Sequence, residues 1–129
     1  MARLTEIVID SLNPASLAKF WQGALDEFTI RAYDDKEIAR LAELGLTPDS
    51  DPNVALDGGS LTIFFQLTLA VKQQRNRIHL DICAENRAAE VQRLIALGAT
   101  LRDELAGHSV MLDPESNEFC VTGPRCDKA

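Results

Sequence analysis

The sequence predicts an α+β fold made of two βαβββ modules that are related by pseudo-twofold symmetry. Three observations support this prediction. Residues 76–99 have the pattern of a strand followed by an amphipathic helix. Residues 1–26 repeat that pattern, and each copy is followed by further short strand patterns that turn residues separate.

The segment 76–99 begins with a period of two and continues with the period of a helix. Its strand part alternates apolar and polar residues from Ile78 to Cys83, so that His79 and Asp81 share one face. The helical part places its apolar residues on one stripe, at Val91, Leu94, Ile95 and Leu97. Gly98 follows at the position where a helix most readily ends.

The N-terminal segment has the same plan. A strand pattern covers residues 4–10, and Asn13-Pro14 predicts a helix N-cap followed by proline in the first turn. Asn13 and Asn86 are 73 positions apart, and so are Glu6 and His79. Two copies are too few for a solenoid, so a duplicated module is the natural interpretation.

Each helix is followed by three more predicted strands. In the first module these cover residues 28–33, 53–56 and 61–69, with a hairpin turn at Gly58-Gly59 and with 61–69 as the longest strand; in the second they cover 100–105, 108–112 and 118–122. We therefore expect one domain over residues 1–129. Its first module spans about 1–70 and its second about 76–124.

The first module contains an insertion over residues 34–52. Its first part predicts a helix, because Asp34 is a suitable N-cap, apolar residues follow in helical register and Gly45 closes the segment. A loop with two prolines comes next. The insertion is either a surface helix at the edge of the sheet or a wall or lid over a pocket, since long insertions in compact domains often serve function.

Composition limits the classes of function. The chain has 129 residues, of which 46% are hydrophobic and 26% charged, and its formal net charge is −7. The negative charge argues against nucleic acid and anionic membranes as partners. No apolar run is long enough to span a bilayer, and residues 1–10 lack the apolar core of a signal peptide. Three cysteines, an odd number, indicate reduced thiols and a cytoplasmic protein.

The two modules are expected to form a curved mixed sheet around a central cavity, with the helices outside. The apolar faces of the first strands must then meet the helices, so Glu6 and His79 point into the cavity. The last strand of each module is expected to add the substrate-binding residues Thr62, Phe64, Gln66, Glu118 and Cys120.

These segments resemble the vicinal oxygen chelate superfamily, and most closely its small glyoxalase-like domain proteins. The resemblance rests on RLTEIVID, AKFWQGAL, NRIHLDI and DPESNEFCV, and it covers nearly the whole chain apart from residues 34–52. It implies a small-molecule ligand and a homodimer. It does not identify an activity, because this fold supports many chemistries.

The resemblance also implies a set of metal-ligand positions on the first and last strand of each module. In this sequence they are Glu6, Gln66, His79 and Cys120. Gln66 is a neutral amide and Cys120 a thiol, where the superfamily usually has glutamate or another anionic or imidazole ligand. A divalent ion (zinc, nickel, manganese or iron) stays open as a cofactor. The altered ligand set nevertheless favours a site without metal.

Three functions compete. The first is a lyase or isomerase, rather than a dioxygenase, in which Glu6 and His79 act as an acid–base or metal-binding pair on a small metabolite. The second is a non-catalytic binding protein of the bleomycin-resistance kind, which sequesters an antibiotic or similar compound. The third is a dimeric structural or regulatory module with a vestigial cavity, in which Glu6 and His79 form a buried pair and Cys120 is an inert thiol.

Overall fold

The computed structural model describes residues 1–124, and the chain forms two compact units, Met1–Val71 and a second that begins at Lys72. The first unit contains β1 (Glu6–Ser11), α1 (Pro14–Ala24), β2 (Thr29–Ile30), α2 (Asp35–Glu43), the short 3₁₀ helix η1 (Pro48–Ser50), β3 (Asn53–Asp57) and β4 (Thr62–Leu67). The second contains β5 (Leu80–Cys83), α3 (Arg87–Leu97), β6 (Thr100–Glu104), β7 (His108–Leu112) and β8 (Glu118–Thr122).

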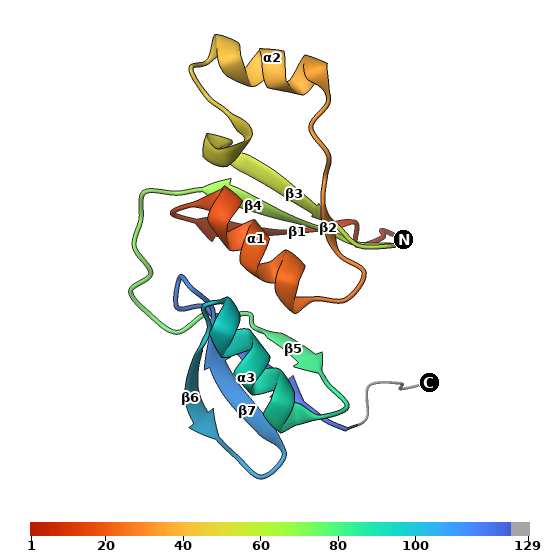
Figure 1. Cartoon of the computed structure of the whole chain (residues 1–129), viewed down its shortest axis with the longest axis vertical. Helices are drawn as coiled ribbons and strands as arrows, with labels where there is room; N and C mark the ends of the chain where they lie inside the picture. Colours follow the sequence, from red (N-terminus) through yellow and green to blue (C-terminus); the bar gives the residue numbers. More distant parts are fainter. Residues whose placement is uncertain (125–129) are drawn as a thin grey trace. The chain divides into compact units, whose positions relative to one another are not determined.

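The two units have the same sheet topology (Figure 1). Their strand orders are β1-β4-β3-β2 and β5-β8-β7-β6, and the first strand of each unit pairs in parallel with the last. The other neighbouring strands are antiparallel. These observations confirm the α+β fold of two βαβββ modules. Within residues 1–124 the strand pairing defines two four-stranded sheets, and the single-domain organisation stays a prediction.

Each sheet has a helix on one of its faces. The helix α1 packs on β1 to β4, and it buries Phe20 and Trp21, whose rings meet edge to face with centroids 5.2 Å apart. In the second unit α3 packs on β6, β7 and β8. The helix-facing strand residues are buried, among them Val54, Leu56, Ile63, Phe65, Met111, Phe119 and Val121. Because side chains alternate along a strand, the residues between them project from the opposite face.

The duplicated asparagines are both helix N-caps. The Oδ1 atom of Asn13 accepts a hydrogen bond from Ser16 N at 3.3 Å, and that of Asn86 accepts one from Ala89 N at 3.0 Å. At the other end of α3, Gly98 has a φ of 122°, a conformation that other residue types rarely adopt. The predicted start and end of this helix are therefore confirmed.

Replacing Asn86 with alanine is expected to lower the free energy of unfolding by about 1 kcal/mol, because the Ala89 N–H loses its acceptor. Urea denaturation measures this loss. The variant Asn86→Asp keeps an acceptor oxygen and should remain close to the wild type. Equal losses in the two variants would contradict the capping role.

Several strands are shorter than predicted. The strand expected at 28–33 is only Thr29–Ile30, because the chain leaves the sheet after Arg31 N donates to Ala55 O and runs toward α2. The strand expected at 61–69 is Thr62–Leu67. Its six residues equal those of β1, so these two are the longest strands within residues 1–124. In the second unit β5 begins at Leu80, and His79 lies immediately before it.

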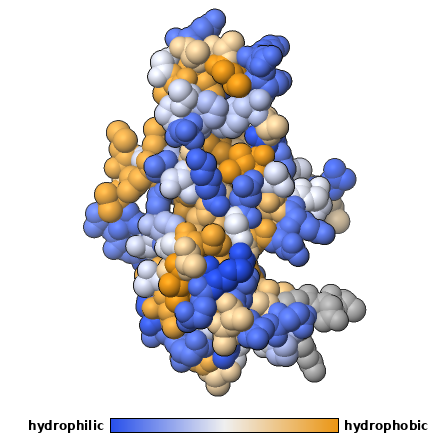
Figure 2. Space-filling model, in the orientation of Figure 1, coloured by the Kyte–Doolittle hydropathy of each residue, from blue (hydrophilic) through white to orange (hydrophobic). Residues whose placement is uncertain are grey.

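The insertion forms the predicted helix. The Oδ1 atom of Asp34 caps it by accepting from Glu37 N at 2.8 Å, and Leu41 is its one fully buried residue. Ile38 and Leu44 remain 44% and 64% exposed, and hydrophobic residues lie among hydrophilic ones on the surface of α2 (Figure 2). Across residues 1–124, none of the helices has the length and apolarity that a membrane span requires.

Candidate functional site

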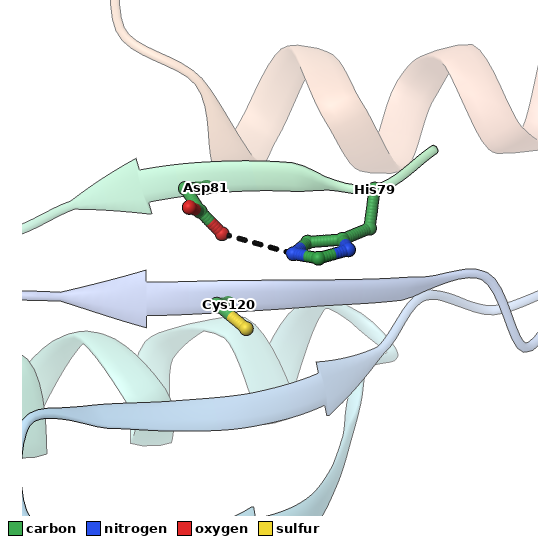
Figure 3. A group of neighbouring side chains, drawn as sticks. All are labelled: His79, Asp81 and Cys120. Atoms are coloured by element: carbon green, nitrogen blue, oxygen red, sulfur yellow. Dashed lines mark ion pairs between the residues drawn. The ribbon is translucent and has the colours of Figure 1, made fainter. Parts of the chain in front are cut away.

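Three potential metal ligands meet on the second sheet, on the face opposite α3. His79 lies immediately before β5, Asp81 lies in β5, and Cys120 lies on β8 directly across from Asp81 (Figure 3). One ligand atom from each residue lies within 4.8 Å of the other two, and the distance from His79 Nε2 to Asp81 Oδ1 is 3.3 Å. The parallel pairing of β5 with β8 brings the cluster together.

The cluster is open to solvent on one side. The side chain of His79 is 37% exposed and that of Asp81 65%, whereas Cys120 is half-buried. Burial raises the pKa of the Cys120 thiol, and the charge of Asp81 and a hydrogen bond to it raise it further. The thiol is therefore protonated at neutral pH when nothing else is bound beside it.

The donor set fits a zinc ion. Imidazole nitrogen, carboxylate oxygen and thiolate sulfur are all zinc ligands, and bonds of roughly 2.0–2.3 Å to a tetrahedral ion place ligand atoms about 3.3–3.8 Å apart. The present spacing needs only a small contraction to meet this requirement. A bound cation would also lower the pKa of Cys120, since a coordinating thiol is deprotonated. Three protein ligands leave one position open, as in catalytic zinc sites.

The other two predicted ligand positions, Glu6 and Gln66, lie in the first unit. Both are exposed, Glu6 at the start of β1 and Gln66 near the end of β4. Strand register places Gln66 opposite Asp10 and Phe64 opposite Val8. Their contribution to a metal site stays a prediction, as does the acid–base pair of Glu6 with His79.

The register also defines which positions correspond in the two sheets. Ile7 pairs with Ile63, and its counterpart Leu80 pairs with Phe119. Phe64 is therefore the counterpart of Cys120. By the same register Gln66 corresponds to Thr122, two residues beyond Cys120.

Three of the predicted substrate-binding residues have structural contacts. Thr62 Oγ1 donates to Asp57 Oδ1 at 2.9 Å, and the Phe64 ring lies 5.5 Å from the guanidinium carbon of Arg31. The Glu118 carboxylate accepts from Lys72 Nζ at 2.8 Å and from Asn76 N at 3.0 Å. Glu118 thus holds residues 72–76 against β8.

Sequence reasoning did not identify Asp81 as a site residue. The signal was present, because alternation along the strand places Asp81 on the same face as His79. The missing information was the pairing partner of Asp81, which is Cys120. Only the register between β5 and β8 joins these three residues into one cluster.

Comparisons with known proteins agree with this architecture. Residues 6–122 match the family described as "Glyoxalase-like domain", and no curated protein is significantly similar in sequence. A glyoxalase/bleomycin resistance protein/dioxygenase family enzyme from Burkholderia phytofirmans is 22% identical, with a TM-score of 0.67 and coverage of 93% of this chain and 97% of the other.

Two further structures have the same fold. The fosfomycin resistance protein FosX from Mesorhizobium loti is 12% identical, with a TM-score of 0.67 over 97% of this chain and 94% of its own. A glyoxalase/bleomycin resistance protein from Albidiferax ferrireducens is 15% identical, with a TM-score of 0.57 over 96% and 100%. Such low identities establish the fold alone. With the family match over residues 6–122, they lead to one conclusion: the chain belongs to the glyoxalase-like domain family.

Proposed function

We propose that this protein binds a divalent metal ion, zinc in the first place, through His79, Asp81 and Cys120, and that it acts on a small oxygen-containing metabolite at this site. The observation that carries the proposal is the convergence of three different ligand types within 4.8 Å on the face of the second sheet opposite α3. When bound, such an ion supplies a Lewis acid for an oxygen atom of the metabolite.

The cluster has features that a purely structural ion pair does not need. Asp81 is 65% exposed, so its pair with His79 contributes little to stability. The Cys120 side chain is half-buried. Its neighbours in the strand, Phe119 and Val121, are buried apolar residues, and they fix the direction of the Cys120 side chain. The half-buried thiol and the exposed imidazole and carboxylate therefore share a site that solutes can reach.

The residues also support proton transfer without an ion. Asp81 Oδ1 lies 3.3 Å from His79 Nε2, so the carboxylate can hold a proton at that nitrogen and orient the imidazole. In this role Asp81 takes the place that the sequence assigned to Glu6. The site with a bound ion and the site without one both support a lyase or isomerase reaction, in which a proton next to a carbonyl group is moved.

Cobalt(II) titration tests the metal site without knowledge of the substrate. The wild-type protein is expected to bind one equivalent and to show the absorption of a cobalt–thiolate bond, and zinc should displace the cobalt. The variant Cys120→Ser should lose that absorption, and His79→Ala and Asp81→Asn should lower the affinity about tenfold or more. Because the pKa of Cys120 is raised, the affinity of the wild type should increase with pH.

The exposed thiol of Cys83 provides the matched control. Cys83 lies on β5, as Asp81 does, but it is not part of the cluster of His79, Asp81 and Cys120. Cys83→Ser should keep the cobalt–thiolate absorption unchanged, and Cys126, which lies outside the described residues, can be replaced in the same way. Absence of the absorption in the wild type, or its loss in Cys83→Ser instead of Cys120→Ser, would disprove the proposed site.

A non-catalytic binding protein is the second candidate. It is favoured by the raised pKa of Cys120, which keeps the thiol neutral and opposes metal binding. A screen of metabolites and antibiotics by thermal shift would identify a ligand. Its recovery unchanged after incubation with metal-loaded protein would support sequestration, and its conversion would support the enzyme. The homodimer, which light scattering would detect, and the cytoplasmic location stay predictions.

A further inference from the structure

The first unit contains a cavity of about 280 Å³, and all of its lining residues belong to that unit. Its lining combines residues of the sheet, residues of the segment after β2 and two residues of the inserted helix α2. They are Arg31, Ala32, Tyr33, Glu37, Arg40, Asp51, Asn53, Ala55 and Phe64. The volume lies just below the roughly 300–1,000 Å³ of typical small-molecule pockets. The inserted helix therefore forms one wall of a pocket.

The acidic groups in this lining are already occupied. Asp51, only 6% exposed, accepts from Tyr33 Oη at 2.6 Å and from Asn53 N at 3.0 Å. Glu37 accepts from Arg40 Nη2 at 2.9 Å. Burial and the Asp51 carboxylate raise the pKa of Tyr33, so its hydroxyl stays protonated as a donor to Asp51. The cavity thus has few acceptors left for a ligand.

The arginine side chains of this lining, in contrast, have N–H groups that are not used in hydrogen bonds to other residues that the structure describes. Arg31 uses Nε and Nη2 for both oxygens of Asp57, at 2.9 and 2.8 Å, and Arg40 uses Nε and Nη2 for Glu37. Within residues 1–124, Nη1 of Arg31, Nη1 of Arg40 and the side-chain amide of Asn53 make no hydrogen bond. These N–H groups can donate hydrogen bonds to a ligand that carries acceptor atoms.

The same cavity provides a flat surface that combines a charged guanidinium group with an aromatic ring. The Arg31 guanidinium lies over the Phe64 ring at 5.5 Å, and its bidentate pair with Asp57 fixes the plane of the guanidinium. Ala55, 8% exposed, lies beside Phe64 in the neighbouring strand. A planar ring can stack here while an acid group at its edge reaches the free N–H groups.

We propose that the cavity between α2 and the first sheet binds a small planar organic anion, namely an aromatic carboxylate, with Arg40 as the residue that selects for the negative charge. The carboxylate accepts from Arg40 Nη1 and Arg31 Nη1, and the ring packs against Phe64. This site lies entirely within the first unit and does not depend on the metal site proposed above.

Benzoate and its neutral isostere benzamide are suitable probes for this site. In ¹H–¹⁵N NMR titrations of the full chain, benzoate at millimolar concentrations is expected to give saturable shifts at the Arg31, Arg40 and Tyr33 signals. The variant Arg40→Gln should weaken benzoate binding about tenfold to a hundredfold, since one charge-assisted hydrogen bond is lost. Benzamide should bind the wild type as weakly as benzoate binds this variant.

A matched control is available on the other helix. Arg93 forms an ion pair with Glu90 at the same spacing of three residues that joins Arg40 to Glu37, but it does not line the cavity. Arg93→Gln should leave benzoate affinity unchanged. Because the Arg40 pair is exposed, Arg40→Gln should keep the wild-type thermal midpoint. Absence of saturable shifts in the wild type, equal affinity for benzamide, or equal affinity in Arg40→Gln would overturn the proposal.

Discussion

Replacing Phe119 with alanine is expected to lower the free energy of unfolding by about 3–5 kcal/mol, the largest effect of any single change proposed for this chain. The Phe119 ring is 0% exposed and lies on the face of β8 that packs against α3. Its removal leaves a cavity between the sheet and the helix. Small domains are stable by only about 5–15 kcal/mol, so the loss is a large share of the total. Chemical denaturation followed by circular dichroism measures it.

Two further variants separate cavity formation from other causes. Phe119→Leu retains most of the buried volume and should lose much less stability. Leu69→Ala removes apolar atoms from a side chain that is 90% exposed, and should stay within about 0.5 kcal/mol of the wild type. Equal losses in Phe119→Leu and Phe119→Ala would contradict the cavity argument. The position also matters for function, since Phe119 precedes Cys120 and fixes the face on which the thiol lies.

The second large effect concerns Glu118. Burial by itself raises the pKa of this carboxyl group, but hydrogen bonds from Lys72 Nζ and from the Asn76 backbone outweigh it and lower the pKa from 4.5 to about 2. Replacing Glu118 with glutamine is expected to reduce the free energy of unfolding by about 2–3 kcal/mol at neutral pH, because the charge-assisted bonds are lost. The segment that links the two units would then lose its attachment to β8.

This contribution has a defined pH dependence. A carboxyl group with a lowered pKa in the folded state stabilises the fold fully above its unfolded pKa of 4.5, and the stabilisation disappears as the pH falls toward about 2. The stability difference between the wild type and Glu118→Gln should therefore shrink over this range. Urea denaturation at a series of pH values measures the difference.

The exposed Glu85 gives a comparison for this titration. Glu85→Gln changes the net charge by the same amount as Glu118→Gln, but it removes no hydrogen bond that holds the linker. Because Glu85 is exposed, Glu85→Gln should change the free energy of unfolding at neutral pH by no more than about 0.5 kcal/mol. A constant difference between the wild type and Glu118→Gln over the whole range would contradict the lowered pKa of Glu118.

Much of the fold could be predicted because its signals are local. The N-caps Asn13 and Asn86 act through hydrogen bonds to residues three positions away, and Gly98 acts through its own backbone angles. Apolar periodicity predicted the burial of Val91 and Leu94 correctly, but Ile95 and Leu97 of the same stripe are 39% and 41% exposed. Strand ends were less accurate, as at β2, because the point at which a chain leaves a sheet depends on the partner strand and on the segment that follows.

The sequence by itself determined the duplicated βαβββ architecture, the inserted helix at 34–45 and the position of His79 and Cys120 as chemically capable residues. Only the tertiary structure decided that Asp81 stands opposite Cys120, that Phe64 rather than Gln66 is the counterpart of Cys120, and that the inserted helix completes a pocket. The physical reason is the same in each case. Periodicity assigns a side chain to a face, but hydrogen-bonded register and packing between distant segments determine which side chains meet on it.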